Sequence, residues 1–316
     1  MRHRPIWYPP AGVKIAPTPD TACAVVVPLE RVALHANNDG VPQLRGWCGG
    51  RNHVVLDDSD EGVDADVRRY MLGCALVAQT HMDLTRYVAD FDISLPLSLP
   101  PTGRSGALPL ATLEHIGRTT QRKHWLTFKG SMYVDAGAGV QRQTLFALRG
   151  LGATDDGDAA RHGIEVWQRC HKAATASASE RHRCERHEHD FNAAPSYEEL
   201  LNTTFAIVPA GRQPASYRLA EVMAAGAIPI FVSGDRYTSS PYVRPFGEVI
   251  DWPSISLHFS WEAVPTIPRA LRRLSPERVA AMQRGVRHAW STYLHPLVAS
   301  QTFYGMLEAR ALSRMR

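Results

Sequence analysis

Residues 205–232 read FAIVPAGRQPASYRLAEVMAAGAIPIFV and decide the fold class. The apolar run 205–208 predicts a buried strand, the Pro-Ala-Gly loop predicts its end, and the pattern of 217–225 predicts a helix. A second apolar run follows Gly226 and predicts another strand at 228–232. This β-loop-α-β order is typical of a parallel sheet with crossover helices, and therefore of an α/β protein.

The same alternation of strand and helix patterns extends along the whole chain. Short apolar runs predict further strands at 22–27, 53–57, 91–95, 125–128, 164–167 and 255–259. Helical patterns predict helices at 64–74, 140–148, 196–201, 261–274, 276–290 and 297–312. We therefore expect a doubly wound α/β architecture that closes with consecutive helices.

A stretch rich in proline and glycine, residues 95–118, has no sustained period and predicts an interdomain linker. It divides the chain into a first domain, residues 1–116, and a second domain, residues 117–316. Small residues at 173–179 followed by ERHRCERHEHD predict an exposed insertion in the second domain.

Composition excludes several classes of protein. The 316 residues are 44% hydrophobic, and 35 basic against 31 acidic residues leave a net charge of +4, which argues against disorder and against a nucleic-acid partner. No apolar run approaches the roughly 18 residues that span a bilayer. The first twenty residues contain five prolines and no apolar signal-peptide core. We expect no membrane span in this chain, which is either soluble or lacks its anchor.

Five cysteines are too few for a disulfide scaffold. Cys170 and Cys184 lie near each other in a polar stretch, so they could close one disulfide. The remaining cysteines sit in or beside apolar segments and are expected to be buried free thiols: Cys23, Cys48 and Cys74.

Two other ligand motifs are weak. A zinc cluster would need a second compact ligand pair beside His182, Cys184, His187 and His189, for which Cys170 with His171 is the only candidate. We therefore expect no metal site. The pair Gly137-x-Gly139 is followed by Arg142 where a dinucleotide fingerprint needs a third glycine, so that fingerprint is not supported.

The start of the predicted helix 217–225 carries polar side chains suited to an anion. Ser216 stands at the N-cap position, and the free N–H groups of a helix start can bind a phosphate. The guanidinium of Arg218 can bind two phosphate oxygens, and Glu221, on the same face, can accept hydrogen bonds from ribose hydroxyls. A capped amphipathic helix with an Arg218–Glu221 ion pair, worth about 0.3 kcal/mol, fits the spacing equally well.

Several ordered motifs then point to one family. They are YEELLNTTFAIVPAGRQPASYRLAEVMAAGAIPIFVSG (197–234), PFGEVIDW (245–252), WLTFKG (125–130) with Arg142 downstream, and GWCGGRNHVVL (46–56). In these motifs the chain resembles the exostosin family, glycosyltransferase family 47, over residues 22–312. The resemblance implies a GT-B fold with two Rossmann-like domains facing a cleft, the first one shortened.

The resemblance also implies an activity. It is the inverting, metal-independent transfer of a sugar from a nucleotide sugar, typically a UDP-sugar, to a glycan acceptor, with no cofactor required. The strand and helix with which the family's first domain usually begins are either missing from the first half of this chain or shortened into residues 1–10. A catalytically silent subunit and a sugar-nucleotide binding module are the alternatives. The chain departs from the family at Ala210, where exostosins commonly carry arginine, and at Met132, where the animal proteins do.

Donor-binding residues are implied by position in the family motifs. Ser216, Arg218 and Glu221 match a Ser-x-Arg-x-x-Glu motif for diphosphate and ribose contacts. Lys129 and Gly130 are expected at a strand end, and Arg142 at a helix start, to neutralise the leaving diphosphate; a solvated surface pair of Lys129 and Arg142 is the alternative. The remaining implied donor-site residues are Gly211, Arg212 and Glu248, the last of which could also be an ordinary loop carboxylate.

Transfer also needs a general base for the acceptor hydroxyl. His53, Asp57, Asp58 and Asp60 follow the Gly-Arg-Asn segment around a strand end, and His53 or Asp60 is the expected catalytic base. A strand-end histidine bonded to backbone, next to a solvated acidic loop, is the alternative.

The resemblance extends to the cellular setting. The sequon Asn202-Thr203-Thr204 and a Cys170–Cys184 pair match positions common in exostosins, which implies a disulfide-bonded glycoprotein in the Golgi or secretory lumen. It further implies polysaccharide biosynthesis or protein glycosylation, and a homo- or hetero-oligomer with related transferases.

Overall fold

In a computed structural model the chain forms two compact units. Unit 1 comprises Met1–Ser98, Tyr242–Ile250 and Ser291–Arg316, and unit 2 comprises Leu99–Pro241 and Asp251–Trp290. The structure describes residues 9–11, 14, 22, 24–29, 42–44, 46–58, 63, 67–85, 87–97, 99, 108–133, 138–149, 163–171, 178–211, 215–234 and 242–314.

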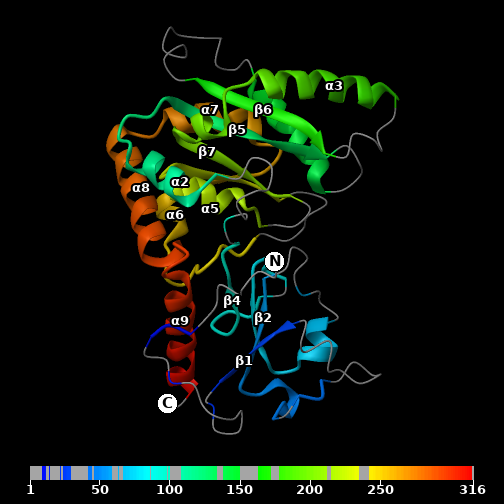
Figure 1. The fold of residues 1–316 in the computed structure, drawn as a ribbon, viewed down its shortest axis with the longest axis vertical. Coiled ribbons are helices and arrows are strands. Elements are labelled where there is room, and N and C mark those ends of the chain that lie inside the picture. The colour runs from blue at the N-terminus through cyan, green and yellow to red at the C-terminus, as the bar shows by residue number, and fades with distance from the viewer. Residues whose placement is uncertain are drawn as a thin grey trace. The chain divides into compact units, whose positions relative to one another are not determined.

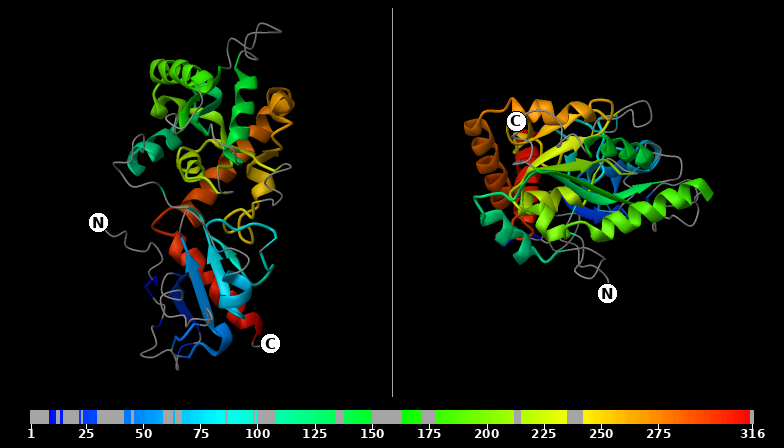
Figure 2. Two further views of the ribbon diagram at one scale, coloured as in Figure 1. Left: turned by 90° about the vertical axis from the view of Figure 1, so that its right-hand side faces the viewer. Right: turned by 90° about the horizontal axis from the view of Figure 1, so that it is seen from above.

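Unit 1 contains a four-stranded sheet in which every neighbouring pair is parallel. Its strand order is β1 (Val25–Pro28), β2 (His53–Asp57), β3 (Leu76–Gln79) and β4 (Ile93–Ser94). All five residues of β2 are buried, as expected for an inner strand of a parallel sheet. The other elements are η2 (Cys48–Gly50), the π-helix η3 (Val67–Leu72), η7 (Trp290–Leu294), which begins at the unit boundary, and α9 (Ala299–Arg314), which runs beside these strands in Figure 2.

Unit 2 contains a five-stranded sheet, again with parallel neighbours throughout, in the order β6-β5-β7-β8-β9 (Figure 1). Its strands are β5 (His124–Tyr133), β6 (Ile164–His171), β7 (Thr203–Pro209), β8 (Ile228–Val232) and β9 (Leu257–Phe259). Its helices are α2 (Leu110–Arg118), η4 (Ala138–Leu148), α3 (Ala178–Ala193), α4 (Tyr197–Leu201), α5 (Arg218–Ala224), α6 (Trp252–Ile255), η6 (Val264–Thr266), α7 (Ile267–Arg272) and α8 (Pro276–Ala289).

Helices cover both faces of the unit 2 sheet. In the left view of Figure 2, α3 and α5 lie on one side of the sheet and α7 on the other. The crossover from β5 to β6, through η4, runs along the sheet in the opposite direction from those through α3 and α5, and right-handed crossovers in opposite directions fall on opposite faces. Helix α7 contacts η6, which packs against η4. Two parallel sheets with crossover helices confirm the expected α/β fold.

The division into units differs from the single boundary expected near residue 116. Helix α2, inside the expected linker, packs against α4 and α5 of unit 2. A Cβ added at its Gly117 would lie only 2.5 Å from the carbonyl oxygen of Ala224, so this contact is backbone against backbone. Two later segments, Tyr242–Ile250 and Ser291–Arg316, return to unit 1.

The predicted insertion 173–190 is partly a helix. Helix α3 contains few apolar residues, but the disulfide between Cys170 on β6 and Cys184 on α3 holds it to the sheet. This bond confirms the expected Cys170–Cys184 pair, with a Cα–Cα distance of 5.5 Å.

Removal of this disulfide is expected to destabilise unit 2. The bond closes a loop with a sequence separation of 14 residues, and a loop of that size restricts the unfolded chain by about 3 kcal/mol. Cys184→Ser should therefore lower the free energy of unfolding by about 3 kcal/mol in non-reducing urea titrations. With reductant added to both, the wild type and the variant should share one midpoint, and an unchanged midpoint of the variant without reductant would contradict this expectation.

The expected burial of the other cysteines is wrong for the two that are described. Cys48 and Cys74 are free and exposed, and Cys23 lies outside the described residues. Among the described residues, no helix combines the length and the apolar character needed to cross a membrane. In the same part of the chain, no three histidine, cysteine, aspartate or glutamate side chains gather as a metal site would require.

Candidate functional site

Arg218 and Glu221 are joined through a third residue in a buried cluster at α5. Each is only 6% exposed. The hydroxyl of Tyr197, from α4, accepts a hydrogen bond from Arg218 Nη1 at 2.8 Å and donates one to the Glu221 carboxylate. The expected pair on one helix face is therefore present, but a phenol bridges it.

The strands of the sheet fix the guanidinium of Arg218. Its Nε donates to the carbonyl of Ile207 on β7 at 2.7 Å, and its Nη1 lies 3.5 Å from the carbonyl of Lys129 on β5. The rings of Phe128 and Tyr197 lie 5.2 Å and 5.4 Å from it. Its Nη2 is buried without a hydrogen-bond partner among the described residues. A buried cationic donor without a partner carries a free-energy cost that a bound anion would remove.

Burial controls the protonation of this cluster. Burial raises the pKa of Glu221, against the opposing effects of the hydrogen bond from Tyr197 and of the Arg218 charge. Burial also raises the pKa of Tyr197, and the charge of Arg218 opposes this rise. The phenol therefore stays protonated and can donate to Glu221.

The stability of the protein should fall as the pH rises through the titration of Glu221. Because the folded-state pKa of Glu221 lies above its ordinary value of 4.5, the folded state binds this proton more tightly than the unfolded chain does. The stabilisation that the protonated Glu221 contributes is fully present below pH 4.5 and is lost as the pH rises through the folded-state pKa. Glu221→Gln should flatten the pH profile of the unfolding free energy above pH 4.5, with the exposed Glu198→Gln as control. An unchanged slope in Glu221→Gln would contradict this.

Ser216 does not cap α5, so the expected N-cap is wrong. The helix begins at Arg218, and the capping position is held by Tyr217, whose side chain makes no capping hydrogen bond. The backbone carbonyl of Ser216 accepts from the N–H of Leu219 at 3.0 Å. The Ser216 side chain is half-buried and stands two residues before Arg218.

Arg142 forms hydrogen bonds near the carboxyl ends of two neighbouring strands, β5 and β7. Its Nε and Nη1 donate to the carbonyls of Ala210 and Ser131, both at 2.9 Å, and its Nη2 lies 3.4 Å from the carbonyl of Pro209. It lies inside η4 rather than at the expected helix start. Arg142 therefore anchors the loop after β7, which contains the buried Gly211. Arg212 lies outside the described residues.

Lys129 and Gly130 lie within β5 and not at its end, which corrects their expected position. Lys129 Nζ donates to the carbonyl of Pro195 at 2.8 Å and lies 4.6 Å from the ring centroid of Phe191. Burial, with the nearby charge of Arg169, lowers its pKa. A Cβ at Gly130 would lie 2.8 Å from the Phe128 ring, so this glycine leaves room for the ring that packs against Arg218.

Glu248 belongs to unit 1, whereas the Arg218 cluster belongs to unit 2. Its carboxylate accepts from Arg310 of α9 and from the Tyr87 hydroxyl, the latter at 3.1 Å. Burial and the charge of Glu248 raise the pKa of Tyr87 to about 12. Glu248 also lines a groove of about 590 Å³ within unit 1, together with Asp90.

His53 is the first residue of β2, at the opposite end from the expected position of a base. It is 3% exposed, its Nδ1 lies 2.9 Å from the carbonyl oxygen of Arg51, and its ring lies 4.7 Å from that of Trp47. This contact agrees with the histidine of the alternative, which is bonded to backbone. Asp60 lies outside the described residues.

Comparison with known proteins gives a consistent assignment. The family model described as "Exostosin GT47 domain" matches residues 38–274. Exostosin-1 from Bos taurus is 27% identical over 297 residues, covering 87% of this chain and 36% of the relative. Exostosin-1 from Drosophila melanogaster is 28% identical over 259 residues, covering 79% of this chain and 31% of the relative. The chain thus spans about a third of the length of the curated relatives it matches.

Solved structures give a more distant likeness. A glycosyltransferase from Rickettsia africae is 11% identical with a TM-score of 0.43, covering 82% of this chain and 70% of its own. WaaG, a glycosyltransferase involved in lipopolysaccharide biosynthesis, is 15% identical with a TM-score of 0.40. The match covers 80% of this chain and 63% of WaaG.

Proposed function

Because the chain belongs to the exostosin family, glycosyltransferase family 47, we propose that it is an inverting glycosyltransferase that transfers a sugar from a UDP-sugar to a glycan acceptor. The observation that carries the proposal is the Arg218 guanidinium. It donates to Ile207 and Tyr197, while its buried Nη2 has no hydrogen-bond partner among the described residues and would be satisfied by an anion. A parallel sheet in each unit agrees with an enzyme built from two Rossmann-like domains.

The residues of the cluster would divide the work on the donor. Arg218 and the Ser216 hydroxyl would bind the diphosphate, and Arg218 would stabilise its charge as the glycosidic bond breaks. Glu221 would accept a hydrogen bond from a ribose hydroxyl while Tyr197 holds its other side. Arg142 would act indirectly, by holding the loop that contains Gly211.

The acceptor side of the reaction depends on a base. The burial of His53 at the start of β2 removes it from the proposal. Asp60 is the proposed base, because a carboxylate beyond the end of β2 would stand at the carboxyl edge of a parallel sheet, where such folds bind substrates. The transfer is proposed to need no metal ion, since Arg218 would neutralise the leaving group.

The disulfide supports a proposed location in the Golgi or secretory lumen, because such bonds persist in oxidising compartments. In that setting Asn202, which follows α4, would carry a glycan. Assembly with related transferases is proposed on kinship alone.

UDP binding and donor turnover test the proposal. UDP at about a hundred times its Kd should stabilise the purified protein by about 2.7 kcal/mol, seen as a rise in Tm. A panel of UDP-sugars, with and without chelator, should then reveal hydrolysis or transfer of at least one donor. Absence of any UDP binding would contradict the proposal.

A catalytically silent, UDP-binding subunit is the second candidate. Ala210 and Met132, at which the family resemblance implies arginine, are 6% and 0% exposed and bring no cation to the site. Lys129 and Arg142 direct their hydrogen bonds to backbone carbonyls. A protein that binds UDP but turns over no donor in the panel, even with a related transferase added as partner, would favour this candidate.

A further inference from the structure

Two exposed thiols lie on neighbouring turns of unit 1. Cys48 opens η2, which leads into β2, and Cys74 lies between η3 and β3. Neither belongs to the Arg218 cluster or to the groove beside Glu248.

The backbones of the two turns are pressed against each other. The N–H of Cys74 donates to the carbonyl of Gly49 at 2.8 Å. A Cβ added at Gly73 would lie 2.6 Å from that same oxygen, and one added at Gly50 would lie 2.4 Å from the carbonyl oxygen of Leu72. No residue larger than glycine fits these positions without movement, so glycine permits the close approach.

These contacts bring the two cysteine residues close together. The Gly49 carbonyl that accepts from the Cys74 N–H belongs to the residue directly after Cys48. A Cβ added at Gly50 would also lie 2.6 Å from the backbone nitrogen of Ala75, so the backbone that follows Cys48 packs on both sides of Cys74. Thiols on turns in such close contact need little movement to reach the Cα separation of about 4.4–6.8 Å that a disulfide requires.

The chemistry of the chain favours oxidation of such a pair. Cys170 and Cys184 already form a disulfide, so the chain is compatible with an oxidising environment. Exposed thiols in that environment exchange with small disulfides, and a second thiol held nearby completes the exchange within the molecule.

We propose that Cys48 and Cys74 form a second disulfide, which clamps the turns that lead into β2 and β3. The oxidant is a low-molecular-weight disulfide such as oxidised glutathione. One protein thiolate attacks it to form a mixed disulfide and releases one glutathione thiolate. The second protein thiolate then attacks the protein sulfur, which forms the internal bond and releases the second glutathione. This proposal is independent of the proposed function.

Counting free thiols in denaturant tests the pairing. The chain has five cysteines, of which one disulfide uses two. After exposure to oxidised glutathione, a second disulfide leaves one titratable thiol per chain instead of three. Cys48→Ser and Cys74→Ser should each raise the count from one to two, because each frees the partner. The matched control, Cys23→Ser, should lower it from one to zero.

Peptide mapping and stability complete the test. Non-reduced digests should contain one cross-linked peptide that joins residues 48 and 74, in monomeric protein. Cys48→Ser, Cys74→Ser and the double variant should share a Tm lower than that of the oxidised wild type by about 5–10 °C, without additivity. Three free thiols after oxidation, glutathione retained as mixed disulfides, a bond to Cys23, or a disulfide between chains would each overturn the proposal.

Discussion

Arg218→Ala is expected to lower the turnover of the proposed UDP-sugar donor by about 10²- to 10³-fold, the largest effect on activity that we predict. The guanidinium is held in place before the donor arrives, so it can stabilise the developing negative charge without reorienting during the reaction. Replacing Arg218 with alanine removes that stabilisation. The protein is also expected to lose the proposed rise in Tm on addition of UDP. Steady-state kinetics and thermal shift, measured on the same preparations, provide both readouts.

The control must separate catalysis from folding, because Arg218 also bonds to Ile207 and Tyr197. Arg149 is a suitable match. It is an arginine of unit 2 that stacks on an aromatic ring, lying 4.5 Å from Trp167, and it pairs with Asp190 at 3.5 Å, outside the Arg218 cluster. Arg149→Ala should retain turnover. Full activity in a folded Arg218→Ala protein would refute the assigned role.

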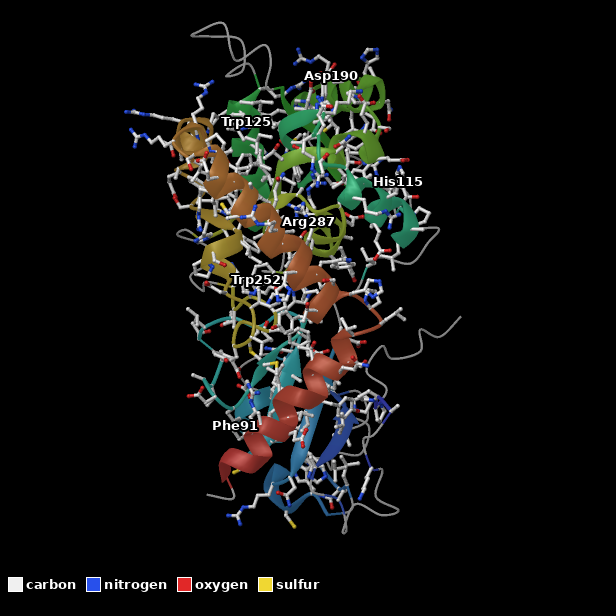
Figure 3. The ribbon with its side chains drawn as sticks, turned by 90° about the vertical axis from the view of Figure 1, so that its left-hand side faces the viewer. Phe91, His115, Trp125, Asp190, Trp252 and Arg287 are labelled. Atoms are coloured by element: carbon white, nitrogen blue, oxygen red, sulfur yellow. A yellow bond between two sulfur atoms is a disulfide. The ribbon has the colours of Figure 1, made fainter. Side chains whose placement is uncertain are left out.

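Arg310→Ala is expected to destabilise unit 1 by about 3–5 kcal/mol, the largest effect on stability that we predict. Arg310 is 8% exposed and carries several contacts of α9. It donates to the carbonyls of Phe91 at 2.9 Å and Asp92 at 2.8 Å, and it pairs with Glu248. Phe91 lies beside α9 in Figure 3. Loss of the Arg310 side chain would remove these hydrogen bonds together with the ion pair to Glu248.

Urea denaturation followed by circular dichroism measures this change. Arg51→Ala, an exposed arginine of the same unit, is the matched control and should stay within about 0.5 kcal/mol of the wild type. Glu248→Gln should lower the free energy of unfolding by less than Arg310→Ala does, since a neutral amide oxygen can still accept a hydrogen bond from the guanidinium. An Arg310→Ala protein as stable as the control would show that α9 does not depend on this side chain.

The strands with continuous apolar runs could be predicted from the sequence, and some other elements could not. Strands β2 and β8 lie where their runs of branched and apolar residues predict them. The sequence ALVAQT (75–80), which contains β3, predicts no element, because a strand of four residues is too short to show a period of its own. Helix α3 was missed because a disulfide and polar contacts, rather than an apolar face, hold it.

The site was predicted in part. The i,i+3 spacing correctly placed Arg218 beside Glu221, since helix geometry alone determines it. The bridging Tyr197 lies 24 residues before Glu221 and reaches it only through the packing of α4 on the sheet. Likewise, no local pattern predicts that Arg142 would donate to strand-end carbonyls, or that Glu248 would join Arg310 of unit 1.

The segmented make-up of unit 1 bears on how the nascent chain matures. Domains usually fold in the order in which the ribosome delivers them, at about 5–20 residues per second. Unit 2 is complete once Trp290 has been synthesised, whereas unit 1 also needs Ser291–Arg316, which are synthesised later. A translating ribosome is therefore expected to present a finished unit 2 before unit 1 can close. During that interval the unfinished unit is the one exposed to chaperones, and a stop codon placed before α9 should leave it permanently open to proteases.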